Sequence, residues 1–423
     1  MSKECKETPT GRIPEEWEVV ELGKVCEINP EKVEYSSIKI VKYIDIESVK
    51  DGKITTYKIF TKNNAPSRAQ RLVKEKDIIV STVRPNLKSF AIVTKEFDNF
   101  ICSTGFAVLR AKEEKVHPEY LFYLTFYDDV FLVQILPIVV GSNYPAINSY
   151  DVYKIIIPLP PLPEQRKIAE ILETIDKAIE KTNQIIEKYK RIKQGLMQDL
   201  LTKGIDEDWQ IRSEETHKFK DSPLGRIPEE WEVVRLGDIF QIKVGGDIDK
   251  IPHSNDKTLE YIYPIYSNTI ENKGLYGFSN IYTYPNYAIT ITARGVLGYA
   301  IPRFEKFNAI IRLLVLIPKC KVDIIFVSEY INTFVKFQIE ETGVPQLTAP
   351  KAAMHKIPLP PLPEQQRIAS ILSQIDETIE KEKRYKEKLE RIKQGLMEDL
   401  LTGRIRVNHL IESVKDVDQK VEV

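Results

Sequence analysis

Apolar residues follow two different spacings along this chain, and the same change of spacing occurs in each half. Over 164–202 and again over 364–402, apolar residues recur alternately three and four positions apart, which predicts two long helices with a narrow apolar stripe. Over roughly 24–156 and 238–356, short alternating or apolar runs are separated by turn residues, which is typical of strand-rich domains. The pattern therefore predicts an α+β fold with two strand-rich domains and two long helices.

Each strand-rich block is predicted to hold several strands followed by one helix. In the first block we expect strands at 38–46, 76–83, 89–94 and 104–110, and a buried helix at 117–136. In the second block we expect strands at 259–266, 287–295, 298–302 and 309–317, and a helix at 327–339. Both blocks are thus predicted to be small α+β domains.

Three motifs occur twice, once in each half of the chain. GRIPEEWEVVELG at 11–23 returns as GRIPEEWEVVRLG at 225–237, an offset of 214 residues. IPLPPLPEQ at 157–165 and RIKQGLM at 191–197 return with an offset of 200 residues. The blocks between these motifs show little similarity. Two long units indicate a duplicated frame rather than a solenoid, whose repeats are short and numerous.

The narrow stripe of each predicted helix needs a partner, because a single helix cannot cover it. The first helix runs from the first block to the second, and the second helix returns only by running back, so the connectivity predicts antiparallel pairing about a pseudo-two-fold axis. A helix over 164–202 is about 58 Å long at 1.5 Å per residue. The predicted coiled-coil seam comprises Ile168, Leu172, Ile175, Ile179, Ile186 and Leu196, together with Ile368, Leu372, Ile375, Ile379, Leu389 and Leu396.

Two features of these repeats have alternative interpretations. Gly195 and Gly395 lower helix propensity within RIKQGLM, so each marks either a close approach of two helices or the footprint of a partner. IPLPPLPEQ alone looks like an SH3 ligand, but prolines followed at once by a helix are also an ordinary rigid exit from a domain. We favour the second interpretation, because the motif leads directly into the predicted helix.

Composition excludes several classes of protein. No run of eighteen apolar residues is present and the first residues lack an apolar stretch, so we expect a cytoplasmic protein without membrane spans. The four cysteines are scattered, which favours reduced, buried thiols over disulfides or a metal site. There is no GxxxxGK[ST], HExxH or paired CxxC, and no Asn/Asp-Pro-Pro-aromatic tetrapeptide. We therefore expect no catalytic residue, metal or cofactor in this chain.

Charge distribution is more informative than the net charge of −1. Between Lys58 and Lys95 nine residues are basic and two are acidic, within strand-like sequence that favours a basic face. The loops STVRPNLKSF and TARGVLGYAI each place an arginine at a hairpin between predicted strands, and arginine and asparagine are the side chains that read guanine and adenine. The candidate DNA-binding residues are Arg68, Arg71, Arg84, Lys88, Tyr266, Asn268, Arg294 and Arg303.

The doubled arrangement IPLPPLPEQ…RIKQGLM, flanking divergent blocks and preceded each time by GRIPEEW, resembles the specificity subunits of type I restriction-modification systems. The resemblance covers the chain from Gly11 to about Thr402. It implies two target-recognition domains that read a bipartite, asymmetric site in double-stranded DNA. It also implies that the repeated helices dock methyltransferase subunits, two in number, with restriction subunits as further partners. S-adenosylmethionine, ATP and Mg²⁺ are expected only in those partner subunits.

The expected organisation has six segments. They are a first target-recognition domain (1–157), a central helix (158–203), a linker (204–224), a second target-recognition domain (225–357), a distal helix (358–403) and a polar tail (404–423). Because the recognition domains of this family diverge in sequence, the candidate DNA-binding residues rest on their chemistry alone.

Two other functions are compatible with parts of the sequence. A coiled-coil scaffold with two peptide- or protein-binding domains would explain the near-neutral charge, and its DNA binding would be absent or insensitive to salt. An enzyme acting alone would need a catalytic constellation, and none is recognisable. The doubled frame favours the non-catalytic specificity subunit over both.

Overall fold

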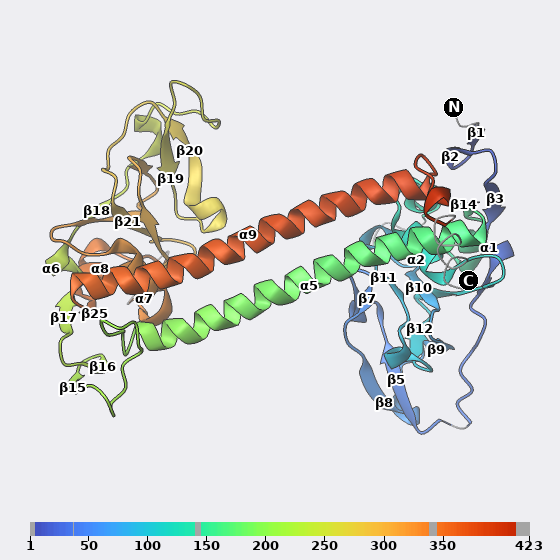
Figure 1. Cartoon of the computed structure of the whole chain (residues 1–423), viewed down its shortest axis with the longest axis horizontal. Coiled ribbons are helices and arrows are strands. Elements are labelled where there is room, and N and C mark those ends of the chain that lie inside the picture. The colour runs from blue at the N-terminus through green and yellow to red at the C-terminus, as the bar shows by residue number, and fades with distance from the viewer. Residues whose placement is uncertain (1–4, 37, 140–144, 338–344, 412–423) are drawn as a thin grey trace, which may run out of the picture. The chain divides into compact units, whose positions relative to one another are not determined.

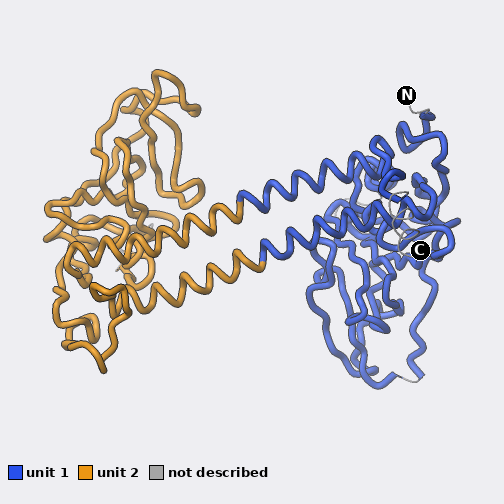
Figure 2. The backbone as a smooth tube through the Cα atoms, in the orientation of Figure 1, with its two compact units in different colours: residues 1–183, 384–423 blue, residues 184–383 orange. Residues whose placement is uncertain are grey.

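The computed structural model forms two compact units, and the boundary between them falls within both long helices (Figure 2). Unit 1 comprises residues 1–183 and 384–423, and unit 2 comprises residues 184–383. The residues that the structure describes are 5–36, 38–139, 145–337 and 345–411. Each unit therefore contains one strand-rich block together with half of each long helix.

The two predicted long helices are present and unbroken (Figure 1). Helix α5 spans Leu162–Leu200 and helix α9 spans Leu362–Leu401. Each helix begins within the repeated IPLPPLPEQ motif, and the last proline of that motif lies in the first helical turn, where a missing N–H costs no hydrogen bond. The proline motif is thus the exit from each domain into its helix, as we expected.

In each unit the start of one long helix packs against the end of the other. In unit 1, Ile168 and Leu172 of α5 share a buried cluster with Leu400 of α9. In unit 2, Ile368 and Leu372 of α9 share a buried cluster with residues at the end of α5, Leu200 among them. The helix segments are therefore antiparallel within each unit.

All twelve predicted seam residues are withdrawn from solvent. Seven are buried: Ile168, Leu172, Ile186, Ile368, Leu372, Ile379 and Leu389. Five are half-buried: Ile175, Ile179, Leu196, Ile375 and Leu396.

The domain of unit 1 is built from two four-stranded sheets. The inner sheet packs against the long helices through Ile78 and Val80, and the intervening Ile79 points to the outer sheet, as the two-residue period of a strand requires. The inner sheet has the order β11 (Phe90–Ile92), β10 (Ile78–Ser81), β13 (Phe106–Ala111), β4 (Cys26–Ile28). The outer sheet has the order β8 (Lys58–Thr61), β5 (Ile40–Ile44), β12 (Ile101–Ser103), β9 (Ala69–Leu72).

The domain of unit 2 repeats this topology despite its different sequence. Its inner sheet has the order β22 (Ala300–Arg303), β21 (Ala288–Ile291), β24 (Leu314–Pro318), β18 (Phe240–Val244). Its outer sheet has the order β20 (Leu275–Ser279), β19 (Tyr263–Tyr266), β23 (Asn308–Ala309). In unit 1, strand β5 pairs antiparallel with β8 and parallel with β12. In unit 2, strand β19 likewise pairs antiparallel with β20 and parallel with β23. The one difference is strand β9, which has no counterpart among the described strands of unit 2. The shared order of the other strands confirms the predicted α+β repeat.

The GRIPEEW motif forms the same frame in both units. It makes a hairpin whose turn needs a glycine at positive φ, Gly11 at +95° and Gly225 at +96°. In unit 1 the frame strands are β1 (Cys5–Thr8), β2 (Gly11–Pro14), β3 (Glu18–Glu21) and β14 (Ile156–Leu159), with short helices α1 (Leu22–Val25) and α4 (Ser149–Tyr153). In unit 2 they are β15 (Phe219–Ser222), β16 (Gly225–Pro228), β17 (Glu232–Arg235) and β25 (Lys356–Leu359), with α6 (Leu236–Ile239) and α8 (Ala349–Met354).

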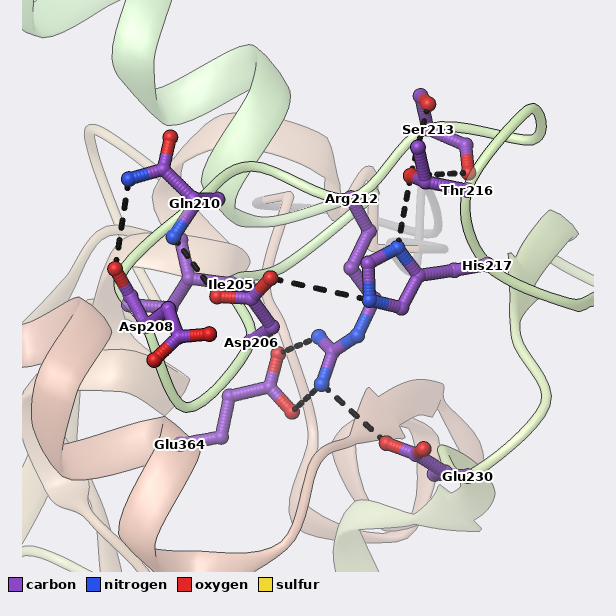
Figure 3. A network of polar contacts seen from close by, with 10 residues as sticks. All are labelled: Ile205, Asp206, Asp208, Gln210, Arg212, Ser213, Thr216, His217, Glu230 and Glu364. Carbon is purple, nitrogen blue, oxygen red and sulfur yellow. Dashed lines mark hydrogen bonds and ion pairs between the residues drawn. The ribbon is translucent and has the colours of Figure 1, made fainter.

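A buried glutamate at the start of each long helix ties the frame together. Glu364 accepts hydrogen bonds from Trp231 Nε1 at 3.2 Å and from Ile205 N at 3.0 Å. It also pairs with Arg212, which in turn contacts Glu230 (Figure 3).

In unit 1 the same cluster recurs. Glu164 accepts from Trp17 Nε1 at 3.0 Å and from Arg406 Nε at 2.6 Å, and Arg406 also contacts Glu16. Each cluster fastens the end of one helix to the start of the other.

The glutamine that follows attaches the domain helix. Gln165 Oε1 accepts from His117 N at 2.8 Å, directly before helix α2 (Pro118–Phe126). Gln365 Oε1 accepts from Asp323 N at 2.9 Å, directly before helix α7 (Ile324–Phe334). The repeated Glu-Gln pair is therefore a structural joint between domain and helix, which explains its presence in both halves.

Several boundaries differ from the prediction. The helix expected at 117–136 is two helices, α2 and α3 (Leu132–Ile135), with a break between them. The helix expected at 327–339 is α7, which begins and ends earlier, and residues 338 and 339 lie outside the described part of the chain. The strand expected at 309–317 is divided between β23 and β24 by a turn at Ile311 and Arg312, both at positive φ.

The predicted linker and tail are also partly wrong. Residues 204–224 contain β15 and the buried Arg212, and the tail begins with the buried Arg406 and Val407, because both arginines must reach a buried glutamate. Residues 412–423 lie outside the described part. All four cysteines are free, but Cys5 and Cys320 are exposed rather than buried.

Candidate nucleic-acid interface

Loops at one edge of the unit 1 domain are tied together by backbone hydrogen bonds. Thr82 N donates to Gly105 O at 2.8 Å, and Thr104 N donates to Arg68 O at 2.8 Å. Ile147 N donates to Thr82 O at 2.9 Å. We define loop cluster 1 as residues 66–68, 82–88, 104–105 and 145–147. It brings Arg68 and Arg84, both exposed, to one edge of the domain.

The turn that carries Arg84 is conformationally unusual. Arg84 and Lys88 have φ values of +49° and +48°, and they bracket a short helical turn in which Pro85 is buried and Leu87 is 63% exposed. Arg84 N donates to Pro145 O at 2.7 Å. Lys88 is half-buried, and its Nζ lies 2.5 Å from Asp128. The strain is held by the surrounding loops, as is common where a side chain must be presented.

The unit 2 domain has an equivalent cluster. Leu347 N donates to Ala293 O at 3.0 Å, as Ile147 does to Thr82 in unit 1. The Asn268 amide joins two loops, since its Oδ1 accepts from Ala293 N at 2.6 Å and its Nδ2 donates to Ile311 O. We define loop cluster 2 as residues 268–269, 292–298, 310–312 and 345–347.

Two arginines belong to loop cluster 2. Arg294 is half-buried, and its Nε has no hydrogen-bond partner among the described residues. Arg312 is exposed. Each domain therefore presents a pair of arginines at the same edge, and cationic loops on a rigid scaffold are suited to phosphates and base edges.

Two candidate residues are internal, which corrects their predicted role. Arg303 is 3% exposed; its Nε donates to Thr290 Oγ1 at 3.0 Å, and its guanidinium lies 3.5 Å from the Tyr266 ring centre. Burial lowers the pKa of Arg303 to about 10 and raises the pKa of Tyr266, whose hydroxyl donates to Glu305. These groups hold strands β19 and β22 together, so they have no free edge to offer to DNA.

Arg71 and Asn268 are both half-buried. Arg71 lies on β9 opposite Cys102, half-buried, with one guanidinium nitrogen lacking a hydrogen-bond partner among the described residues, and burial lowers its pKa. Both polar atoms of the Asn268 amide are occupied by backbone groups. Of the eight candidates, five lie in the loop clusters, namely Arg68, Arg84, Lys88, Asn268 and Arg294, and backbone groups already occupy the Asn268 amide.

Sequence reasoning missed Arg312. It lies inside the apolar run AIIRLLVLI, which predicts a continuous strand, and no glycine or proline marks the turn. No signal in the sequence alone distinguishes this turn from a strand.

Within the described part of the chain, no three His, Cys, Asp or Glu side chains are grouped to hold a metal ion. The same residues include no helix with the length and apolarity to cross a membrane.

Two domains of equivalent topology with different exposed loops, each joined to segments of the same two helices, define the architecture of this chain. The chain belongs to the type I restriction modification DNA specificity family, whose model matches residues 14–191 and 228–391. Both matched segments contain one strand-rich block and the start of one long helix. The family's description is that of a DNA specificity domain, and relatives of this chain are named specificity subunits of type I restriction enzymes, which supports a role in DNA sequence recognition.

Known proteins resemble the chain over nearly its whole length. It is 32% identical to a Methanocaldococcus jannaschii protein provisionally named the MjaX specificity subunit of a type I restriction enzyme, covering 95% of this chain and 96% of that protein. It is 26% identical, with a TM-score of 0.57, to a solved structure described as the basis of complex assembly and conformational transition of the type I R-M system, covering 93% and 99%. The S subunit from M. genitalium, 16% identical with a TM-score of 0.60, shares the fold, covering 91% and 96%.

Proposed function

We propose that this chain reads a bipartite, asymmetric DNA site, with loop cluster 1 on one half-site and loop cluster 2 on the other. The observation that carries the proposal is the equivalence of the two clusters on one shared scaffold, combined with their different side chains. Scaffolds of equivalent topology place the loops alike, and different side chains select different bases. An asymmetric site with an unread spacer follows.

The paired helices act as the spacer in this proposal. Half-sites on one face of B-DNA recur about every 34 Å, and a helix of 39 residues is about 58 Å long. The two dimensions are of the same order, so helix length sets the permitted separation of the half-sites. The chemistry, with S-adenosylmethionine, ATP and Mg²⁺, belongs to the partner subunits.

The RIKQGLM segments form the proposed docking surface for two modification subunits. Ile192 and Ile392 are each 40% exposed. A Cβ added at Gly195 or Gly395 would meet no heavy atom of the described residues within 4 Å, so these glycines do not mark a close approach of helices. An identical sequence that leaves apolar side chains on the surface at both places is suited to two copies of one partner.

The test uses the chain assembled with its modification subunits and duplexes in which each half-site is altered separately. Arg84→Ala should weaken discrimination at one half-site by about 10-fold or more and leave the other unchanged, because a base contact contributes about 1–3 kcal/mol. Equal loss at both halves contradicts the assignment. Binding that is absent or insensitive to salt would instead favour a protein-binding scaffold.

A further inference from the structure

The turn at Ile311 and Arg312 adopts a conformation that its residues disfavour. Ile311 has φ +53° and Arg312 has φ +60°, the left-handed region that glycine and asparagine tolerate and a β-branched residue avoids. The neighbours Ile310 and Leu313 are 0% and 1% exposed. The chain is therefore anchored on both sides of a strained pair.

The surroundings fix this turn from three directions. Ile311 N donates to Gly246 O at 3.0 Å, Gly246 N donates to Ala309 O at 3.0 Å, and the Asn268 amide donates to Ile311 O. A Cβ at Gly245 would lie 2.8 Å from the Ala309 carbonyl, so this close approach requires glycine. Contacts within the domain therefore hold the turn in a strained conformation that its own residues disfavour.

In this strained conformation the side chains of Ile311 and Arg312 are exposed to solvent. Ile311 is 44% exposed. Arg312 is exposed, and its side chain makes no hydrogen bond or ion pair with the described residues. Ile311 is only partly covered and Arg312 is exposed, so burial of these two side chains does not account for the strain. Strain of this kind is characteristic of binding sites.

The unit 1 domain supplies an arginine to the same place by another route. There the residues after the parallel outer strand are Thr104 and Gly105, and Thr104 N donates to Arg68 O. Arg68 immediately precedes β9, the strand without a described counterpart in unit 2. Two different local structures thus place an exposed arginine at equivalent edges of the two domains.

We propose that Ile311 and Arg312 form the base-contacting turn of the unit 2 domain. This inference rests on the proposed function and names the residues of unit 2 that contact the bases. This turn binds in the major groove of duplex DNA, because a guanidinium pairs with guanine acceptors there while an adjacent apolar side chain contacts a thymine methyl group. Asn268, which we had expected to read adenine, acts here as a positioning residue for the turn.

Three variants test the proposal in the chain assembled with its modification subunits. Arg312→Lys keeps the charge but loses the planar fork, so discrimination at one base pair of one half-site should fall about 10-fold or more while overall affinity stays within about 3-fold. Ile311→Gly relieves the strain, so the melting temperature should stay equal or rise while discrimination at that half-site falls. Arg226→Ala, an exposed arginine paired with Glu214 on the unit 2 frame, is the matched control and should change neither.

The outcomes separate this inference from the proposed function. If the unaltered complex binds no DNA sequence selectively, the proposed function fails. If it binds selectively and Arg312→Lys and Ile311→Gly keep the full base preference at both half-sites, only the assignment of this turn is overturned. Loss of modification-subunit binding in either variant would also overturn it, because the turn would then be a protein contact.

Discussion

Single buried charges hold the frame of each unit, and their removal should be costly. The side chains of Arg212 and Glu364 are 6% and 2% exposed, so Arg212→Met leaves a carboxylate buried without its cation. We expect a loss of about 3–5 kcal/mol in the free energy of unfolding of unit 2. Denaturant unfolding checks this, with Arg226→Ala as a control expected within about 0.5 kcal/mol. An equal, small effect of both substitutions would contradict the importance of the buried pair.

Glu329 of helix α7 couples the stability of unit 2 to pH. Lys193 of α5 lies 3.2 Å from Glu329 of α7 and 2.8 Å from Asp376 of α9, and burial raises the pKa of Glu329 above its usual value. Since the folded pKa lies above the unfolded one, the stability from protonated Glu329 is complete below the unfolded pKa and is lost as pH rises through the folded pKa.

Glu329→Gln should remove this loss. The free energy of unfolding of the variant, relative to the unaltered chain, should therefore increase as pH rises from the usual pKa of a glutamate through the raised pKa of Glu329. Urea unfolding at several pH values measures it. Tyr123→Phe, at the equivalent position where Tyr123 donates to Asp176, is the control in unit 1 and should show no such trend in this range. A pH-independent difference for Glu329→Gln would refute the coupling.

At the scale of elements, the sequence predicts what periodicity and repetition encode. The long helices, their seam and the duplicated frame all follow from spacing and identity, because burial of one face imposes a period. Periodicity does not encode φ, so the turn at Ile311 and Arg312 looked like the middle of a strand. It also does not encode pairing: Arg303 looked like an exposed loop cation, but it stacks on Tyr266 inside the domain.

Neighbouring apolar positions on helix α9 should behave in opposite ways. Leu389 is 5% exposed and belongs to the seam, whereas Ile392, three residues later, is 40% exposed. Leu389→Ala should cost about 2–5 kcal/mol of stability, and Ile392→Ala close to none. Ile392→Ala should instead weaken the copurification of modification subunits. Normal assembly of Ile392→Ala would exclude this face as the docking surface.

At the scale of the whole molecule, both units pair the helices in the same register. In unit 1, Lys393 of α9 lies 2.6 Å from Asp176 of α5; in unit 2, Lys193 of α5 lies 2.8 Å from Asp376 of α9. Residues that differ by 200 positions thus exchange roles. The units also divide at positions 200 residues apart, after residue 183 in α5 and after residue 383 in α9.

This symmetry specifies how the proposed spacer should be lengthened. Seven residues inserted after Asn183 and another seven after Lys383 add one heptad to each helix, so the seam keeps its period. Each helix grows by about 10.5 Å, the rise of about three base pairs of B-DNA. Methylation mapping should then show the same two half-sites separated by a longer spacer. The matched control inserts glycine and proline in the same places; it should retain half-site recognition but relax the spacer. An unchanged spacer in the heptad variant would show that the helices do not set the distance.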